Sequence, residues 1–300
     1  MSMMLHHRKV VASLSGAAAW LVLACVPASA QAQSAQPLNL GALRGPHGAN
    51  GASTTVSPPA PAPAQAPSVG RQWRGLYVSG FIGAAQGDSD VATTTIFTTI
   101  GYFASSSPPA IIAAGDQTLE TSDTEFGGSA GYNIQIGRAV FGGEGDYSSM
   151  RLSGTVTSGD TYPCCAPTTF SIDQSIETRW LATLRFRGGV TFGRTFVYGT
   201  YGMAWTSINY DAVFTDTFAN AHENGGLDNL QSSTVWGAGV EFWCLRNFSV
   251  KGEYLNTKFE PASTTSTNLT AGGTAYPSNV FTHSSNLKVQ VFRGGVIFRF

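Results

Sequence analysis

The sequence predicts an all-β fold, one eight-stranded antiparallel transmembrane β-barrel with up-and-down connections. Three observations predict this fold class. Charged residues make up only 12% of the 300 residues, about half of their share in an average soluble domain. Apolar and polar side chains alternate with period two along most of the chain after Trp73, as in strands with two different faces. The connections between these strands are alternately long and short, as in transmembrane barrels.

The N-terminal residues predict export and cleavage. Residues 6–9 are HHRK, an apolar stretch covers 10–26, and PASA at 27–30 provides an Ala-x-Ala cleavage site. This is the pattern of a secretory signal peptide, so we predict that residues 1–30 are removed and that the mature protein has no membrane helix. A second interpretation takes Leu23-Ala24-Cys25 as part of a lipoprotein cleavage box, in which Cys25 would be acylated.

Two further regions follow the signal peptide. Residues 31–70 are rich in Ala, Pro, Gln, Ser and Gly, with Arg44 as the one Lys, Arg, Asp or Glu and no Phe, Trp or Tyr. Such a segment buries too little apolar surface to offset its ordering entropy. We therefore predict a disordered periplasmic linker over 31–70 and the barrel domain over 71–300.

Eight segments with strand character follow one another along the predicted barrel domain. Segment 179–192 is the clearest, because Trp180, Leu184 and Phe186 fall on one face while Arg185 and Arg187 fall on the other. The first and fifth segments are apolar on both faces, so their orientation stays open. The eight segments are 73–85, 126–135, 141–147, 179–192, 196–207, 236–242, 248–254 and 292–300.

The last segment is rich in aromatic residues. Val291 and Ile297 interrupt its alternation. Its lipid-facing rings predict that Phe300 joins an aromatic girdle at the membrane interface. The residues on its apolar face, opposite Arg293 and Arg299, are Phe292, Val296, Phe298 and Phe300.

The connections between the segments set the topology. The predicted long loops are 86–124, 155–178, 211–231 and 261–286, and the short turns are 136–138, 193–194 and 244–247. Short turns lie on the periplasmic side of such barrels and long loops lie outside. Backbone groups in hydrocarbon must all be paired, so the sheet has to close on itself. Apolar side chains then face lipid, and polar side chains face the lumen.

The predicted lumen carries charges of both signs. An eight-stranded barrel is only wide enough for its own side chains, and buried charges are costly unless they are paired. We therefore predict an ion-pair network that fills the lumen and fixes the register. The alternative is a narrow ion path lined by the same side chains. The predicted network consists of Glu144, Asp146, Glu241 and Glu253 with Arg185, Arg187, Lys251 and Arg293.

Five motifs, in this order, resemble a known family. They are WRGLYV at 73–78, VFGGEGD at 140–146, WLATLRFRGG at 180–189, GAGVEF at 237–242 and VKGEYL at 250–255. The chain is similar to the alphaproteobacterial outer-membrane β-barrel proteins, the major surface antigens and porin-like proteins. The resemblance implies that Val296, Phe298 and Phe300 form the signal read by the barrel-assembly machinery. It also leaves hemin binding by the external loops as an alternative.

One short motif suggests catalysis. His283-Ser284-Ser285-Asn286 resembles the His-x-Ser-Asn motif of outer-membrane lipid A deacylases, in which a histidine base activates a serine. Their orienting carboxylate follows downstream, but residues 287–300 contain no Asp or Glu. The motif also falls in a predicted external loop rather than at a lipid-facing strand position. We predict no active site, and keep a lipid A-modifying enzyme that uses His283 and Ser285 as an alternative.

Cofactor and disulfide chemistry is sparse. After signal cleavage, His47, His222 and His283 lie in separate segments without the spacing of a metal site, so we predict no cofactor. Cys164 and Cys165 fall in a predicted external loop, and Cys244 falls at a periplasmic turn. A hydrocarbon layer of about 25 Å separates the two groups, so no bridge joins them. A disulfide between the adjacent pair and no bond at all both stay open.

These patterns predict an integral protein of the cell outer membrane with a structural and surface-antigen role. A small-solute or ion channel and a lipid-modifying enzyme are the alternatives. The predicted partners are outer-membrane lipids, lipopolysaccharide and, during biogenesis, the barrel-assembly machinery. The formal net charge of −1 argues against a nucleic-acid partner.

Overall fold

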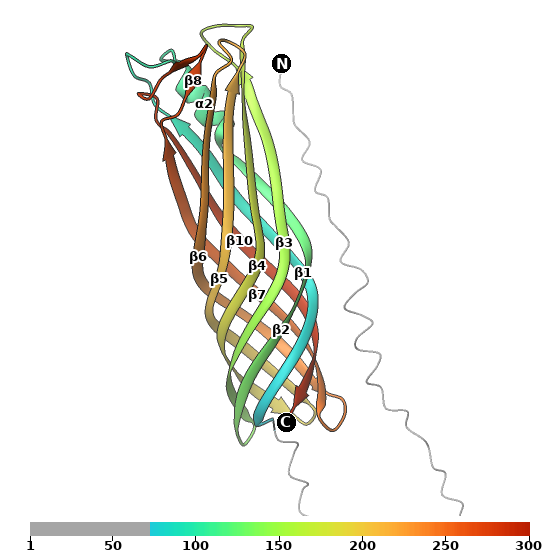
Figure 1. Ribbon diagram of the computed structural model, residues 1–300. Coiled ribbons are helices and arrows are strands. Elements are labelled where there is room, and N and C mark those ends of the chain that lie inside the picture. The colour runs from blue at the N-terminus through green and yellow to red at the C-terminus, as the bar shows by residue number, and fades with distance from the viewer. Residues whose placement is uncertain (1–72) are drawn as a thin grey trace, which may run out of the picture.

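The computed structural model describes residues 73–300 (Figure 1). The predicted signal peptide, with Cys25, and the predicted linker lie outside the described residues and stay predictions. The elements are β1 (Gly75–Thr95), α2 (Ser107–Gly115), β2 (Gln117–Ile136), β3 (Ala139–Thr161), β4 (Thr169–Phe192), β5 (Thr195–Asp216), β6 (His222–Trp243), β7 (Phe248–Ser266), β8 (Thr270–Ala271), β9 (Thr274–Ala275) and β10 (Phe281–Arg299).

Eight long strands form a closed ring. Each of them pairs antiparallel with the strand before and after it, and β8 and β9 form a small hairpin on the edge of β6. The first and last long strands pair from Tyr77 opposite Arg299 to Thr95 opposite Phe281. This pairing closes the ring and removes the free edges that an open sheet would present. The predicted eight-stranded antiparallel up-and-down barrel is confirmed.

All three predicted short turns lie at one end of the barrel, which we call the turn end. They join β2 to β3 at 137–138, β4 to β5 at 193–194 and β6 to β7 at 244–247. Gly137 and Gly193 both have a φ of 61°, in the left-handed region that glycine adopts without steric cost. β1 begins and β10 ends at the same end (Figure 1).

The strands are much longer than predicted. They contain 19 to 24 residues, whereas a tilted strand crosses a bilayer with about 9–11. The predicted long loops were therefore wrong in extent, because most of their residues continue the strands. In these upper parts of the strands the alternation is reversed, because the apolar side chains point inward. Ile208, Tyr210, Ala212 and Phe214 of β5, for example, are buried inside. That pattern suits a strand with water outside and protein inside.

Beyond the middle of the barrel, the ring separates into two sheets. Within the described residues, β2 and β3 pair only as far as Phe126 opposite Ser149, and β6 and β7 only as far as Val235 opposite Thr257. The other pairs of adjacent long strands stay paired further towards the end opposite the turn end. Strands β7-β10-β1-β2 therefore face strands β3-β4-β5-β6 as in a β-sandwich. We call this part the head, defined as residues 88–122, 151–179, 207–233 and 258–288.

Apolar side chains fill the space between the two sheets of the head. One cluster takes residues from both sheets, for example Leu119 and Phe259 from one and Leu152 and Ile208 from the other. A sandwich core of this kind is dry and tightly packed. It explains why the outer half of the molecule hides its apolar residues, whereas the half near the turn end exposes them.

A second cluster closes the far end of the head, and we call it the plug. Helix α2 lies in this end (Figure 1), with Ile111 buried and Pro108 at its start; proline fits the first helical turn because its missing N–H would have no partner there. The side-chain amide of Gln174 donates a hydrogen bond of 2.9 Å to the Gly115 carbonyl. The plug consists of Phe103, Ile111, Tyr162, Phe170, Ile172, Phe214, Ala221, Leu269, Ala271 and Phe281.

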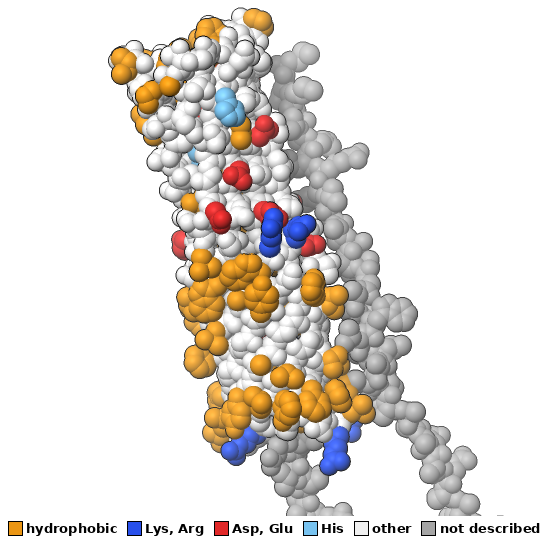
Figure 2. All heavy atoms as spheres, viewed as in Figure 1, with side chains coloured by type: hydrophobic (Ala, Val, Ile, Leu, Met, Phe, Trp, Pro, Cys, Tyr) orange, Lys and Arg blue, Asp and Glu red, His pale blue; other side chains and the backbone are white. Residues whose placement is uncertain are grey.

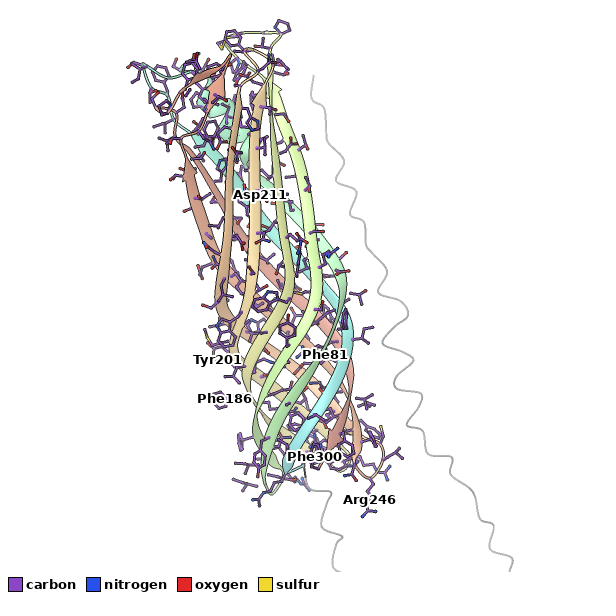
Figure 3. The ribbon with its side chains drawn as sticks, in the orientation of Figure 1. Phe81, Phe186, Tyr201, Asp211, Arg246 and Phe300 are labelled. Atoms are coloured by element: carbon purple, nitrogen blue, oxygen red, sulfur yellow. A yellow bond between two sulfur atoms is a disulfide. The ribbon has the colours of Figure 1, made fainter. Side chains whose placement is uncertain are left out.

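Outward-facing apolar side chains surround the half of the barrel near the turn end, and we call them the belt. Figure 2 shows them as two bands of hydrophobic side chains, with charged side chains above the upper band and below the lower one. Leu184 is 61% exposed and Phe186 is 80% exposed, so the predicted lipid-facing side of segment 179–192 does point outward (Figure 3). No helix among residues 73–300 is long and apolar enough to span a membrane.

The structure assigns the two faces of β1, which the sequence left open, and explains the interruption in the last strand. Tyr77 and Phe81 of β1 are buried inside, while Leu76 and Ile82 are exposed. In β10, the apparent interruption at Ile297 is an apolar residue on the inner face. The alternation of the last strand is therefore intact, and its inner face is apolar at some positions and charged at others.

Candidate functional site

All eight predicted lumen charges are buried in the barrel interior, at the level of the belt. Each is at most 7% exposed. Five strands supply them, so the ion pairs cross the lumen as well as joining neighbours. They are Glu144 and Asp146 of β3, Arg185 and Arg187 of β4, Glu241 of β6, Lys251 and Glu253 of β7, and Arg293 of β10.

Arg185 bridges three carboxylates. Its Nη2 lies 2.9 Å from Glu144 Oε1 and 2.6 Å from Asp146 Oδ2, and its Nη1 lies 2.9 Å from Glu253 Oε1. Its Nε donates to Thr183 Oγ1 at 2.9 Å. These contacts tie the neighbouring strands β3 and β4 to β7, which is not adjacent to either in the ring.

The other cations extend these contacts across the lumen. Arg187 bonds Glu144 at 3.0 Å and Glu241 at 2.8 Å, and Lys251 Nζ lies 3.0 Å from Glu144 Oε1. Arg293 Nη2 lies 3.0 Å from an oxygen of Asp146 and 2.7 Å from one of Glu253. Each carboxylate of the predicted set thus contacts at least one cation.

Two members of the network were missing from the predicted set. Arg299 bonds Glu241, and Arg293 Nη1 lies 3.5 Å from Glu125 Oε1. The two missing residues are Glu125 and Arg299. Their positions in the alternation of their strands, next to outward-facing residues, are a sequence signal that places them inside. With them, five carboxylates face five cations, and we call these ten residues the lumen lattice.

Aromatic rings cover the lattice on the side of the turn end. Tyr77 donates to Glu144 at 2.7 Å and accepts from Arg187 at 2.9 Å. The Arg187 guanidinium also lies 4.2 Å from the ring centroid of Tyr198, within the range of a cation–π contact. Glycines make room for these rings, because a Cβ at Gly131 would lie 2.3 Å from the Tyr77 hydroxyl. The lattice can therefore neutralise charge and connect strands.

The three residues of the predicted assembly signal, at the end of β10, lie on the outer face near the turn end. Val296 and Phe300 are exposed, and the rings of Phe298 and Phe300 meet edge to face with centroids 5.1 Å apart. Phe248 of the neighbouring strand contacts Phe298 at 5.2 Å. The three residues of the predicted assembly signal are thus on the belt, and their role in assembly stays a prediction.

The His-x-Ser-Asn motif does not lie in a loop, as predicted, but within β10, and His283 and Ser285 point into the head. His283 is fully buried, with Nδ1 at 3.0 Å from Thr93 Oγ1 and Nε2 at 3.1 Å from Glu223 Oε1. A carboxylate does reach His283, but it comes from β6 rather than from downstream. Thr93 and Glu223 thus contact both ring nitrogens of His283.

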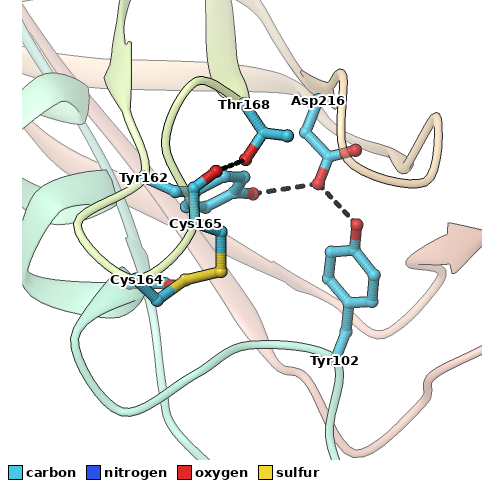
Figure 4. Close-up of a disulfide and its surroundings, with 7 residues drawn as sticks. Tyr102, Tyr162, Cys164, Cys165, Thr168 and Asp216 are labelled. Atoms are coloured by element: carbon cyan, nitrogen blue, oxygen red, sulfur yellow. Dashed lines mark hydrogen bonds between the residues drawn. A yellow bond between two sulfur atoms is a disulfide. The ribbon is translucent and has the colours of Figure 1, made fainter.

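A polar cluster borders the plug (Figure 4). The hydroxyls of Tyr102 and Tyr162 donate to the same Asp216 oxygen, at 2.6 and 3.0 Å. Nearby, Cys164 and Cys165 form a disulfide with each other, which decides between the two possibilities that the sequence left open. Cys244 lies at the opposite end, in the turn between β6 and β7.

The tyrosine pair predicts loosening of the plug at alkaline pH. Burial, followed by the Asp216 carboxylate, raises the pKa of Tyr162 above its ordinary value, and burial also raises the pKa of Tyr102. Because the pKa is raised, the contribution of each protonated tyrosine to the stability of the plug is complete below about pH 10. This contribution is lost as the pH rises further. We expect protease sensitivity of residues 96–116 to appear above about pH 10, and to do so less steeply in Tyr162→Phe. An exposed tyrosine variant, Tyr201→Phe, should follow the unmodified protein; if Tyr162→Phe does so too, this explanation is wrong.

The described residues contain no group of three His, Cys, Asp or Glu arranged to hold a metal ion. The titratable residues that converge in residues 73–300 do so as ion pairs and hydrogen bonds. The site with the most convergent chemistry is therefore the lumen lattice.

Comparisons with solved structures give matches at low sequence identity. The chain is similar to the outer membrane protease OmpT from Escherichia coli, with 9% identity, a TM-score of 0.38, and coverage of 75% of this chain and 96% of that one. It is also similar to Ail, the attachment invasion locus protein of Yersinia pestis, with 15% identity, a TM-score of 0.27, and coverage of 75% and 99%.

Sequence comparisons identify the family. The 31 kDa outer-membrane immunogenic proteins of Brucella melitensis and Brucella suis are 28% identical over 151 residues, which is 47% of this chain and 58% of each relative. The match thus spans little more than half the length of these relatives. A family model described as the outer membrane protein beta-barrel domain matches residues 52–300. The chain therefore belongs to the outer-membrane β-barrel family, and its location is the outer membrane.

Proposed function

We propose that this protein is a closed structural barrel that displays a stiff β-sandwich head on the cell surface, where it acts as a surface antigen. The turn end then faces the periplasm and the head faces outward, as in other barrels with short periplasmic turns. The immunogenic Brucella relatives support the antigen role. Strands of 19 to 24 residues, about twice the length needed to cross the bilayer, support a head that projects from the membrane.

The observation that carries the proposal is the continuous packing of the interior. Near the periplasmic end, Trp73, Phe196 and Trp243 pack together. The lumen lattice follows, then the sandwich core and finally the plug. Four successive layers of side chains thus occupy the path that a solute would take, and an eight-stranded barrel has little width to spare.

We also propose that the protein is not an enzyme. The burial of His283 and its bonds to Thr93 and Glu223 support a structural role for the motif that resembles the lipid A deacylases. His283 also stacks on Phe281, with ring centroids 6.0 Å apart. It therefore joins the plug to the neighbouring strands. The outward-facing rings of Phe298 and Phe300 support the proposed recognition by the barrel-assembly machinery.

Electrical recording tests the closed state. We expect refolded protein in planar bilayers to give no stepwise currents, because several packed layers block the lumen. The deletion of residues 96–116, which removes α2, should be silent as well, since the lattice and the sandwich core remain. A gel shift between boiled and unboiled samples would show that the recorded protein is folded.

The opposite result would establish a channel. Discrete currents from folded protein, with a conductance or ion selectivity that changes in Glu241→Gln, would overturn the proposal and favour the narrow ion path. Currents only in the deletion variant would show that the plug alone closes the pore. That outcome would contradict the blocking role given to the lattice.

A further inference from the structure

A groove opens in the outer wall where β2 and β3 separate. Its volume is about 710 Å³, and apolar Phe126 and Met150 line it together with Arg151 and Arg179. It exists because the last backbone pair between the two strands is Phe126 with Ser149. Above that pair the strands belong to different sheets of the head.

The groove lies at the upper edge of the belt. Phe126 is itself a belt residue, and Trp180, which follows Arg179 in the chain, stacks on Tyr147 with ring centroids 6.0 Å apart. Aromatic residues of this kind mark the membrane interface of a barrel. Figure 2 shows Lys and Arg side chains, with Asp and Glu side chains beside them, directly above the upper hydrophobic band. A ligand in the groove therefore sits at the level of the outer-leaflet head groups.

Basic side chains that could bind an anion occur in the head at this level only. Within the head, Lys and Arg occur solely at its lower boundary, as Arg151, Arg179, Lys258 and Lys288. The rest of its exposed surface carries carboxylates, such as that of Asp211. Negative charge repels a phosphate from the upper head, so an anionic lipid finds basic partners only at the boundary.

The two arginines of the groove have donors to spare. Arg179 bonds Glu177 through Nε at 2.9 Å and Nη2 at 3.1 Å. Within residues 73–300, the Arg151 guanidinium has only a 3.8 Å contact with Glu177, too long for a hydrogen bond. The side chains are 71% and 63% exposed. Asp123, the carboxylate in the groove, accepts the backbone N–H of Arg151 at 2.6 Å.

We propose that this groove binds the phosphorylated glycolipid of the outer leaflet, with Arg151 and Arg179 holding a phosphate. Guanidinium groups bind phosphate strongly because they donate two parallel hydrogen bonds. Phe126 and Met150 offer apolar contact to an acyl chain. The hydroxyls that line the groove suit a sugar more than a phospholipid head group, and they belong to Ser122, Thr124, Ser149 and Ser153.

The test measures lipid binding to the folded full-length protein in detergent by native mass spectrometry. The probes are bisphosphorylated lipid A, the same lipid with its phosphates removed, and phosphatidylglycerol. We expect bisphosphorylated lipid A to bind best, and the double variant Arg151→Gln/Arg179→Gln to bind it at least about tenfold more weakly, as for the loss of one or more charge-assisted hydrogen bonds.

The matched control is Lys258→Gln/Lys288→Gln, which removes the same charge at the same level but away from the groove. It should keep most of the binding. Equal losses in the two double variants would show attraction to general surface charge and overturn the site. Equal binding of dephosphorylated lipid A or of phosphatidylglycerol would overturn the ligand.

A third variant keeps the test decisive if the arginine variant does not fold. Ser122→Trp fills the groove and leaves every charge in place, so it should weaken binding while the boiled and unboiled samples still differ on a gel. Unchanged binding in this variant would overturn the proposal. Lipid binding and conductance are tested independently, because the groove lies on the outer wall whereas the proposed closure concerns the lumen.

Discussion

Arg185→Ala is expected to keep the barrel from reaching its stable folded form. The guanidinium of Arg185 is buried and contacts Glu144, Asp146 and Glu253 at 2.6 to 2.9 Å. Truncation leaves these carboxylates with too little positive charge in a site from which water is excluded. Removing one partner of such a buried ion pair costs about 3–5 kcal/mol, a large part of the stability of a typical domain.

The measurement is the gel shift between boiled and unboiled samples, followed by urea unfolding in detergent. Arg179→Ala is the matched control, because Arg179 is exposed and bonds only Glu177 among the described residues; its unfolding midpoint should not change. Arg185→Met combined with Glu253→Gln should recover part of the loss, since it removes one charge of each sign. A fully stable Arg185→Ala barrel would show that the lattice contributes little to stability.

Phe281→Ala is expected to loosen the plug while the part of the barrel in the membrane stays folded. Phe281 is fully buried, and its ring lies 5.3 Å from that of Phe214 and 5.8 Å from that of Phe103. Replacing a buried phenylalanine with alanine costs about 3–5 kcal/mol, because apolar contact is lost and a cavity remains. The cost falls on the plug, since the lumen lattice is at the level of the belt.

Limited proteolysis on intact cells gives the measurement. Cleavage within residues 96–116 should become fast in Phe281→Ala, while the gel shift of the barrel persists. Phe218→Ala is the control because its ring is 58% exposed, and surface changes usually stay within about 0.5 kcal/mol. Loss of the gel shift together with the cleavage would show that the head and the barrel unfold as one unit.

The half of the barrel near the turn end could be predicted closely from the sequence. Alternation in segment 179–192 and its equivalents gave the number of strands and their inner and outer faces, because lipid outside and charge inside make the two faces very different. The short turns were visible as 136–138, 193–194 and 244–247, since tight connections leave few residues between strands. Parity also carried a signal for Glu125 and Arg299, which the predicted set omitted.

The head was missed because its strands carry the reverse pattern and have polar, loop-like outer faces. Ile208, Tyr210 and Phe214 alternate with polar residues, but short alternating runs flanked by Thr, Ser and Asn also suit loops. Whether such a run becomes a strand depends on a facing sheet that buries its apolar side. That sheet comes from distant parts of the chain, as in the cluster that joins Leu119 to Ile208.

The sequence by itself determined a membrane barrel, its strand order and the side chains that face lipid, because a bilayer and a narrow lumen impose strict rules on every residue. Only the tertiary structure decided where the barrel divides into two sheets, what plugs its end and which distant residues meet. Glu223 contacts His283, which lies 60 residues away in the sequence. The pairing of β3 with β4 brings Arg151 and Arg179 to the same carboxylate, that of Glu177. Such contacts depend on register and sheet packing, which local sequence patterns do not encode.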